Sequence, residues 1–161
     1  MKLLKIALSI LLIYLFQVTI FSRLSVFGVK ADILLIVTTL FAVTYGAEEG
    51  FLMGLYCGLV QDIFGGSFYM QTVSKAVLGF LIGTFKESVF GTEEGVALTA
   101  VAVATVTNFI LELMMLFFFF GRPIASPLAL MSALIISCLY NSLLAPIFFP
   151  MVKFGARLLR E

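Results

Sequence analysis

Side chains that could take part in chemistry are few in this chain, and most of them stand inside apolar stretches. The sequence has no histidine and two cysteines, Cys57 and Cys138, each within an apolar run. Nucleophilic catalysis by serine needs an adjacent base, and zinc or haem sites need histidine, cysteine or similar ligands. We therefore expect no catalytic residues, no metal site and no cofactor, and we expect both cysteines to be free thiols.

Four polar residues are the candidates for a functional or structural site within the apolar stretches: Asp62, Lys75, Asn108 and Glu112. Asp62 and Lys75 stand at facing ends of two consecutive segments, so an ion pair between them is expected. Charged groups in such segments are usually paired or functional. We favour a pair that fixes the register of the two helices, with a binding role as the alternative.

Asn108 and Glu112 are four residues apart, which places them on the same face of a helix. Glu112 is the most conspicuous carboxylate inside an apolar segment. It could be a proton or cation site, or a contact to a partner protein. The interpretation we favour is a hydrogen bond into the bundle, to Lys75, Gln61 or a hydroxyl group. Gln17 and Asn141 are expected to hold helices together through their amides.

Glycines recur with a spacing of four residues in one stretch, and a second, shorter set follows. The first set comprises Gly46, Gly50, Gly54 and Gly58, and the second comprises Gly79 and Gly83. A face of small residues lets two helix backbones approach closely, which is how many membrane helices pack. We predict that the third segment crosses the fourth, or a helix of a partner, on these faces.

The composition requires a solvent other than water for much of the surface. Of 161 residues, 62% are apolar and 12% are charged, whereas soluble domains have roughly 25% charged residues. We predict an all-α, polytopic membrane helical bundle that forms a single transmembrane domain over residues 1–161. A spanning helix needs about 20 apolar residues, and six spans are expected near residues 3–21, 32–45, 50–64, 72–85, 96–120 and 128–152. Five spans would result if one short segment were re-entrant.

The distribution of Lys and Arg indicates the orientation of such a bundle, because cytoplasmic loops are richer in both residues. With both termini inside, the inner side holds Lys2, Lys5, Lys86, Lys153, Arg157 and Arg160, and the outer side holds Arg23, Lys30, Lys75 and Arg122. We therefore expect a multi-pass protein of a plasma membrane with both termini in the cytoplasm. The net charge of +1 gives no basic surface for nucleic acid.

One part of the chain resembles a known family. The residues that carry the resemblance are Lys30-Ala31-Asp32 before an apolar segment, the turn Gly46-Ala47-Glu48-Glu49-Gly50, the run from Gly54 to Asp62, the pair Gly65-Gly66, and the run from Ser74 to Gly83. This pattern resembles MreD, the rod shape-determining membrane protein of bacteria. Length and the expected number of spans agree over the whole chain, and residues 30–83 are the specific part.

The resemblance implies a non-enzymatic scaffold of the cell-elongation machinery in the bacterial inner membrane. Such a protein would bind MreC, a single-span protein, and would lie indirectly in one assembly with RodA, its transpeptidase and the MreB filaments. It would thereby help to control peptidoglycan synthesis and rod shape. The family is also similar in fold to the six-helix substrate-binding subunits of energy-coupling-factor transporters.

That likeness supplies a second function hypothesis, a small-molecule-binding membrane subunit of a vitamin-type transporter. Its site would lie on the outer side around Asp62, Lys75 and Glu112, with walls of Phe and Tyr side chains.

Overall fold

The computed structural model describes residues 2–21, 23–66, 69–89, 94–121 and 126–160. Within these ranges the chain is helical, apart from short connections and one isolated bridge between Val26 and Val29. The helices are α1 (Lys2–Phe16), continued by the π-helical turn η1 (Gln17–Phe21), α2 (Ile33–Tyr45), α3 (Ala47–Gly65), α4 (Met70–Val89), α5 (Glu94–Phe120) and α6 (Pro127–Arg160). The all-α fold class is confirmed, and each expected segment corresponds to one helix.

Two of these helices are long and apolar enough to cross a membrane by length and composition. They are the stretches Ala97–Phe119 in α5 and Pro127–Phe154 in α6, of 23 and 28 residues. Two shorter apolar helical stretches, Leu8–Ile20 and Ile33–Tyr45, lie in α1–η1 and α2.

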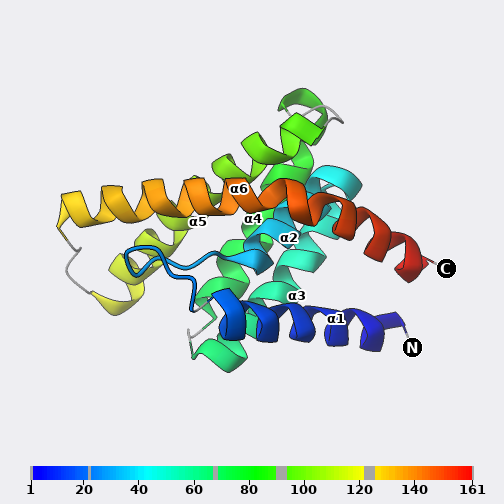
Figure 1. Ribbon diagram of the computed structural model, residues 1–161, viewed down its shortest axis with the longest axis horizontal. Coiled ribbons are helices and arrows are strands. Elements are labelled where there is room, and N and C mark those ends of the chain that lie inside the picture. The colour runs from blue at the N-terminus through cyan, green and yellow to red at the C-terminus, as the bar shows by residue number, and fades with distance from the viewer. Residues whose placement is uncertain (1, 22, 67–68, 90–93, 122–125, 161) are drawn as a thin grey trace.

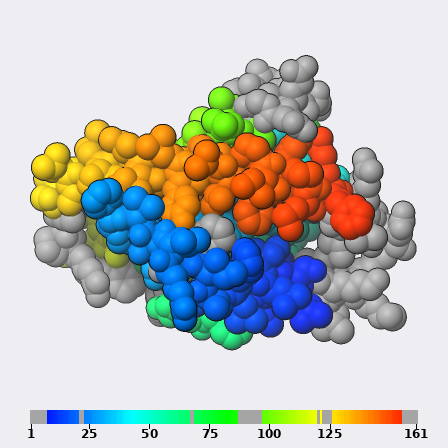
Figure 2. Space-filling view, viewed as in Figure 1, coloured from blue at the N-terminus to red at the C-terminus, as the bar shows by residue number. Residues whose placement is uncertain are grey.

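Helix α2 lies at the centre of the molecule. Nine of its thirteen residues are buried, including Thr38 and Thr39, whose hydroxyls donate to Leu34 O and Leu35 O one turn earlier. Figure 2 shows α6 and the N-terminal segment covering one face of the molecule, so that little of α2 is visible there. Both chain termini lie at the same end of the structure (Figure 1). Apolar side chains of α1, α3, α5 and α6 complete the main core around α2.

Helices α3 and α4 pack backbone against backbone along the two sets of glycines. A Cβ atom added to Gly50 would lie 2.5 Å from Gly79 O, and one added to Gly83 would lie 2.5 Å from the backbone of Ala47. At Gly54 and Gly58 an added Cβ would collide with the backbone of Lys75 and of Gln71–Thr72. The predicted crossing of the third and fourth segments is therefore confirmed, and the glycine faces are occupied within the chain.

Gly46 has a different role from the other glycines of its set. Its φ of +103° lies in the region that L side chains rarely adopt, and it forms the turn between α2 and α3. An added Cβ there would meet only Lys86 Nζ, at 3.7 Å. Glycine is needed at this position for the backbone conformation of the turn.

The ends of α5 and α6 that lie away from the termini project from the core. Every described side chain between Phe109 and Tyr140 is at least partly exposed, and the two helices extend together to the left in Figure 1. Large apolar side chains stay exposed on α6 in a row, with Ile135 at 53%, Leu139 at 68% and Leu143 at 74%. These surfaces need a solvent or partner that is itself apolar.

The first prediction concerns the contact between α3 and α4. We expect Gly54→Ala to lower the free energy of unfolding by about 3 kcal/mol or more, since overpacking typically costs 1–3 kcal/mol and backbone atoms yield less than side chains. Leu52→Ala on the same helix is the control, because Leu52 is 50% exposed. Equilibrium unfolding in detergent micelles measures both variants. Equal, small effects of the two substitutions would contradict the proposed role of the close contact.

Candidate functional site: a buried polar network

Lys75 is the most deeply buried charged group that the structure describes. Its exposed fraction is 0%, and Gly54 of α3 lies directly against its backbone, which keeps the start of α4 deep in the molecule. The Nζ atom donates to Asp32 Oδ2 at 2.7 Å and to Gln71 Oε1 at 2.6 Å. A buried ammonium group needs both a counter-ion and hydrogen-bond acceptors, and Lys75 has them.

Asp32 connects three helices. It is the N-cap of α2, where its Oδ1 accepts from Leu35 N at 3.0 Å, as expected for an aspartate that begins a helix. Its Oδ2 pairs with Lys75 of α4, and its backbone N–H donates to Asn141 Oδ1 of α6 at 3.0 Å. The position of Asp32 therefore depends on α2, α4 and α6 together.

The predicted ion pair between Asp62 and Lys75 is wrong. Asp62 instead accepts from the backbone N–H groups of Gln71 and Thr72 at 3.1 and 2.7 Å, and from Thr72 Oγ1 at 2.6 Å. The first N–H groups of a helix have no partner within it, and α4 begins at Met70, so the end of α3 places Asp62 where these donors are. Lys75 lies further along α4 and reaches Asp32.

Lys75 is one of the charges that are expected on the outer side from the sequence. Its side chain is buried inside the molecule and not in a loop. Of these charges, Arg122 lies outside the described residues.

Gln71 carries the network from α4 to α5. Its Oε1 accepts from Lys75, and its Nε2 donates to Glu112 Oε1 at 3.0 Å. Asn108 Nδ2 donates to the same Glu112 oxygen at 2.6 Å, which confirms that these two residues share a face of α5. Glu112 is bonded into the bundle as we favoured, but through Gln71 and Asn108 rather than Lys75, Gln61 or a hydroxyl group.

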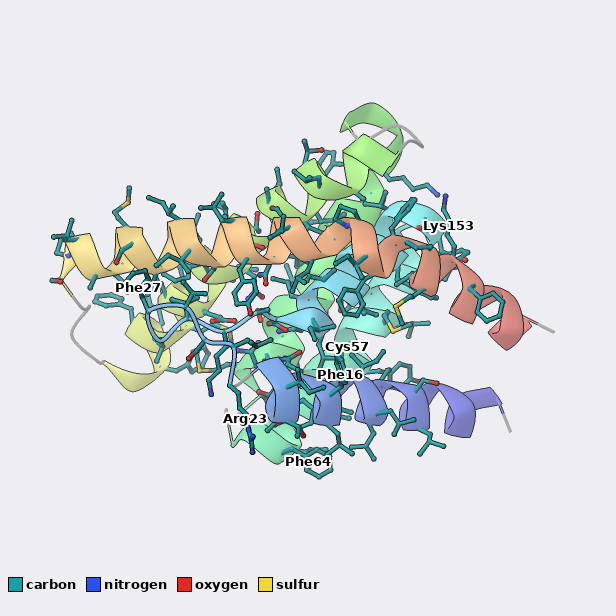
Figure 3. All side chains as sticks on the ribbon, in the orientation of Figure 1. Phe16, Arg23, Phe27, Cys57, Phe64 and Lys153 are labelled. Atoms are coloured by element: carbon teal, nitrogen blue, oxygen red, sulfur yellow. The ribbon has the colours of Figure 1, made fainter. Side chains whose placement is uncertain are left out.

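Amide side chains also bind α1 and α6 to the core, as expected. Gln17 Oε1 accepts from Leu34 N at 3.1 Å, and Asn141 Nδ2 donates to Thr105 Oγ1 at 3.2 Å. Both cysteines are free, with Cys57 buried among core side chains (Figure 3). Within the described ranges, no group of three or more Asp, Glu, Cys or His side chains is placed to hold a metal ion.

Sequence reasoning missed Asp32 and Gln71 as members of the site. Asp32 was named only among the residues that carry the resemblance, and Gln71 was not singled out. Two signals were available. A lysine inside an apolar segment requires a carboxylate, and Asp32 was a third acidic candidate beside Asp62 and Glu112. Gln71 stands four residues before Lys75, the spacing at which helical side chains meet.

The assembled site suits binding and positioning better than covalent chemistry. It contains one ion pair, one further carboxylate and several amides, and it joins η1, α2, α4, α5 and α6. No protein-family model, curated protein or solved structure matches the chain. The fold and site define an all-helical protein with two helices able to cross a membrane and a buried polar network between its helices.

The second prediction separates the two possible partners of Lys75. In a double-mutant cycle, Asp32→Asn and Lys75→Met should show a coupling energy of about 1–3 kcal/mol, because each single change leaves the other group without its partner. The cycle of Asp62→Asn with Lys75→Met is the control and should give about 0.5 kcal/mol or less. Unfolding free energies in micelles measure both cycles. Larger coupling to Asp62 would contradict the observed pairing.

Proposed function

We propose that this protein is a non-enzymatic scaffold of the bacterial cell-elongation machinery, built as a membrane bundle of about six spans. It binds an MreC-like single-span protein, and through it acts on the peptidoglycan synthase RodA, its transpeptidase and the MreB filaments. Both termini lie in the cytoplasm. The resemblance of residues 30–83 to the MreD family supports this proposal, and one structural observation carries it furthest.

That observation is the convergence of the residues that carry the resemblance. Asp32 and Lys75, from its first and last parts, form an ion pair at 2.7 Å. Gly54 and Gly58 contact the start of α4, and Asp62 caps it. Residues that stand far apart in the sequence pattern thus act together to hold α2, α3 and α4. This convergence supports the proposal that the residues of the pattern form one structural unit.

The exposed surface supports a location in a bilayer. Large apolar side chains are exposed on α1, α4, α5 and α6, with examples in Leu12 at 58%, Phe80 at 50% and Met114 at 50%. Monomeric soluble proteins rarely expose contiguous apolar patches of more than a few hundred Å². Helix α2 has only 13 residues, short for a span, and its polar start at Asp32 is shielded by α4 and α6. A locally thinner bilayer accommodates such a helix.

Partner helices need a surface other than the glycine faces, since α3 and α4 use those on each other. The exposed apolar rows of α1, α5 and α6 remain, and they are rich in Leu, Ile, Met and Phe. In lipid, association on such faces is driven by side-chain packing and by interhelical hydrogen bonds. A scaffold with a closely packed centre and uncovered outer helices is suited to hold several partners.

The alternative function, a small-molecule-binding subunit of a vitamin-type transporter, is favoured by a different observation. The polar network is not fully enclosed: Asp32 has a side-chain exposure of 20%, and Glu112 is partly exposed. Ligand sites combine apolar walls with a few placed polar groups of this kind. Copurification with an ATP-hydrolysing module, or a bound vitamin in the purified protein, would support this alternative.

The third prediction tests the arrangement in the membrane. Figure 3 shows Arg23 and Phe27 on one side of the molecule and Lys153 towards the other. In a chain whose two cysteines are replaced by alanine, Phe27→Cys should react with a membrane-impermeant thiol reagent in intact spheroplasts. Lys153→Cys should react only after the membrane is opened. Equal labelling of both positions in intact spheroplasts would contradict the proposed orientation.

The fourth prediction tests the partner. A tagged chain co-expressed with an MreC-like single-span protein should copurify with it in detergent, because the proposed contact lies within the membrane. A single-span protein of unrelated function, expressed at the same level, is the control. Recovery of both proteins in equal amount, or of neither, would argue against the scaffold proposal.

A further inference from the structure

The connection between η1 and α2 contains a tight turn that presents an exposed aromatic ring. Val26 and Val29 exchange two backbone hydrogen bonds of 2.9 Å each. Phe27 and Gly28, which lie between them, have φ values of +51° and +83°. Two positive φ values between paired residues are typical of the turn that closes a two-residue β-hairpin. The Phe27 side chain is 92% exposed, more than any other large apolar side chain that the structure describes.

Phenylalanine is an unfavourable residue at this position for two reasons. The left-handed region favours Gly and Asn, and a bulky side chain is strained there. In water, the exposed ring also leaves its apolar surface in contact with solvent. No contact within the described part of the chain covers the ring, so a contact outside the chain would offset both costs.

The turn is held in place at both of its ends. Before the turn, the hydroxyl of Tyr140 in α6 donates to Leu24 O at 2.8 Å. After the turn, Ala31 is buried in the core and Asp32 caps α2. Phe27 therefore stands at the tip of a segment whose two ends are fixed to the bundle.

The surface around Phe27 is apolar and basic. Leu24 and Val26 are exposed beside it, and the exposed residues Arg23 and Lys30 stand on either side in the sequence. Residues 23–31 include no acidic residue. An apolar group flanked by cations matches the boundary of a bilayer, where phosphate groups lie next to the acyl chains.

The turn also continues the exposed apolar surface of α6. Figure 3 shows Phe27 beside the first half of α6, and Figure 2 shows the segment after α1 next to α6 on one face of the molecule. In this half of α6, Leu128, Met131 and Ile135 are exposed. Under the proposed function this surface of α6 contacts lipid, which places Phe27 at the same bilayer.

We propose that residues 23–30 form an anchor in the outer leaflet of the membrane. The Phe27 ring inserts at the boundary between headgroups and acyl chains, and Arg23 and Lys30 bind lipid phosphates. The inference rests on the membrane location given under the proposed function, and not on the identity of the partner protein. The substitution Phe27→Cys keeps its thiol close to the turn backbone, at the level of the headgroups, where a reagent in the outer solution reaches it.

Tryptophan fluorescence in nanodiscs tests the position of the ring. The chain has no tryptophan, so Phe27→Trp introduces a single fluorophore at an exposed position. Lipids brominated near the headgroup end of their acyl chains should quench it at least about twofold relative to unbrominated lipids, because interfacial apolar groups lie at this depth. Leu139→Trp on the exposed side of α6 should also be quenched, whereas Glu48→Trp at the exposed start of α3 should be quenched less.

The outcomes separate the anchor from the proposed function. Quenching at Leu139→Trp without quenching at Phe27→Trp would overturn the anchor and leave the membrane location intact. No quenching at either position would refute the membrane location, and the anchor with it. A blue shift of Phe27→Trp emission that appears only with a co-expressed MreC-like protein would overturn the lipid contact and assign the turn to that partner. If no such partner binds, the scaffold function fails, and the quenching still decides the anchor.

A second set of variants tests the two cations. In the Phe27→Trp chain, Arg23→Gln combined with Lys30→Gln should lower the quenching in anionic nanodiscs by about half, because each cation near the surface attracts the anionic headgroups. Lys153→Gln, near the end of α6 that carries the C-terminus, is the control and should leave the quenching unchanged. Unchanged quenching in the double variant would overturn the role of Arg23 and Lys30 in the anchor.

Discussion

The charge of Lys75 must be balanced inside the molecule, and this constraint determines how the other helices are placed. Lys75 has no contact with solvent. It is held there because Gly54 allows the backbones of α3 and α4 to touch at this level. A buried ammonium without a counter-ion would cost several kcal/mol. The start of α2 must therefore bring Asp32 to it, and the connection from η1 to α2 and the contact with α6 follow from this position.

The polar network and the apolar core have different roles in the bundle. Hydrogen bonds of Asp32, Gln71 and Asn141 connect α2, α4, α5 and α6. The packing around these contacts relies on apolar residues such as Leu40, Ile82 and Val152. Polar contacts are directional, whereas apolar contacts tolerate small displacements. The polar contacts fix the register of α2, α4, α5 and α6, and the apolar side chains fill the space between these helices.

The sequence predicts the helices and the glycine contact well because both depend on local pattern. Apolar runs between Gly and charged residues mark each helix, and a spacing of four residues puts Gly50, Gly54 and Gly58 on one face. The partner of Lys75 is not local. Asp62 is nearer to Lys75 in the sequence than Asp32 is. Because Asp62 stands so close to the start of α4, however, it accepts from the first N–H groups of that helix and not from Lys75. Asp32 is 43 residues from Lys75, and only the placement of α2 brings them together. Whether each helix spans a bilayer depends on the surroundings, which the chain pattern alone does not contain.

The closeness of α3 and α4 also bears on how the proposed scaffold would hold its partners. Small residues often mark helix surfaces that associate with other membrane proteins, and that interpretation was open for the glycine faces here. The glycine faces of α3 and α4 contact each other, so they are not available to a partner protein. They make the centre of the bundle rigid, and the outer helices remain for recognition. On α5 and α6 the exposed side chains are large and apolar and give little specificity by themselves. A polar position among them, such as the partly exposed Glu112, discriminates between partners more strongly, because a polar group without a hydrogen-bond partner is costly in an apolar environment.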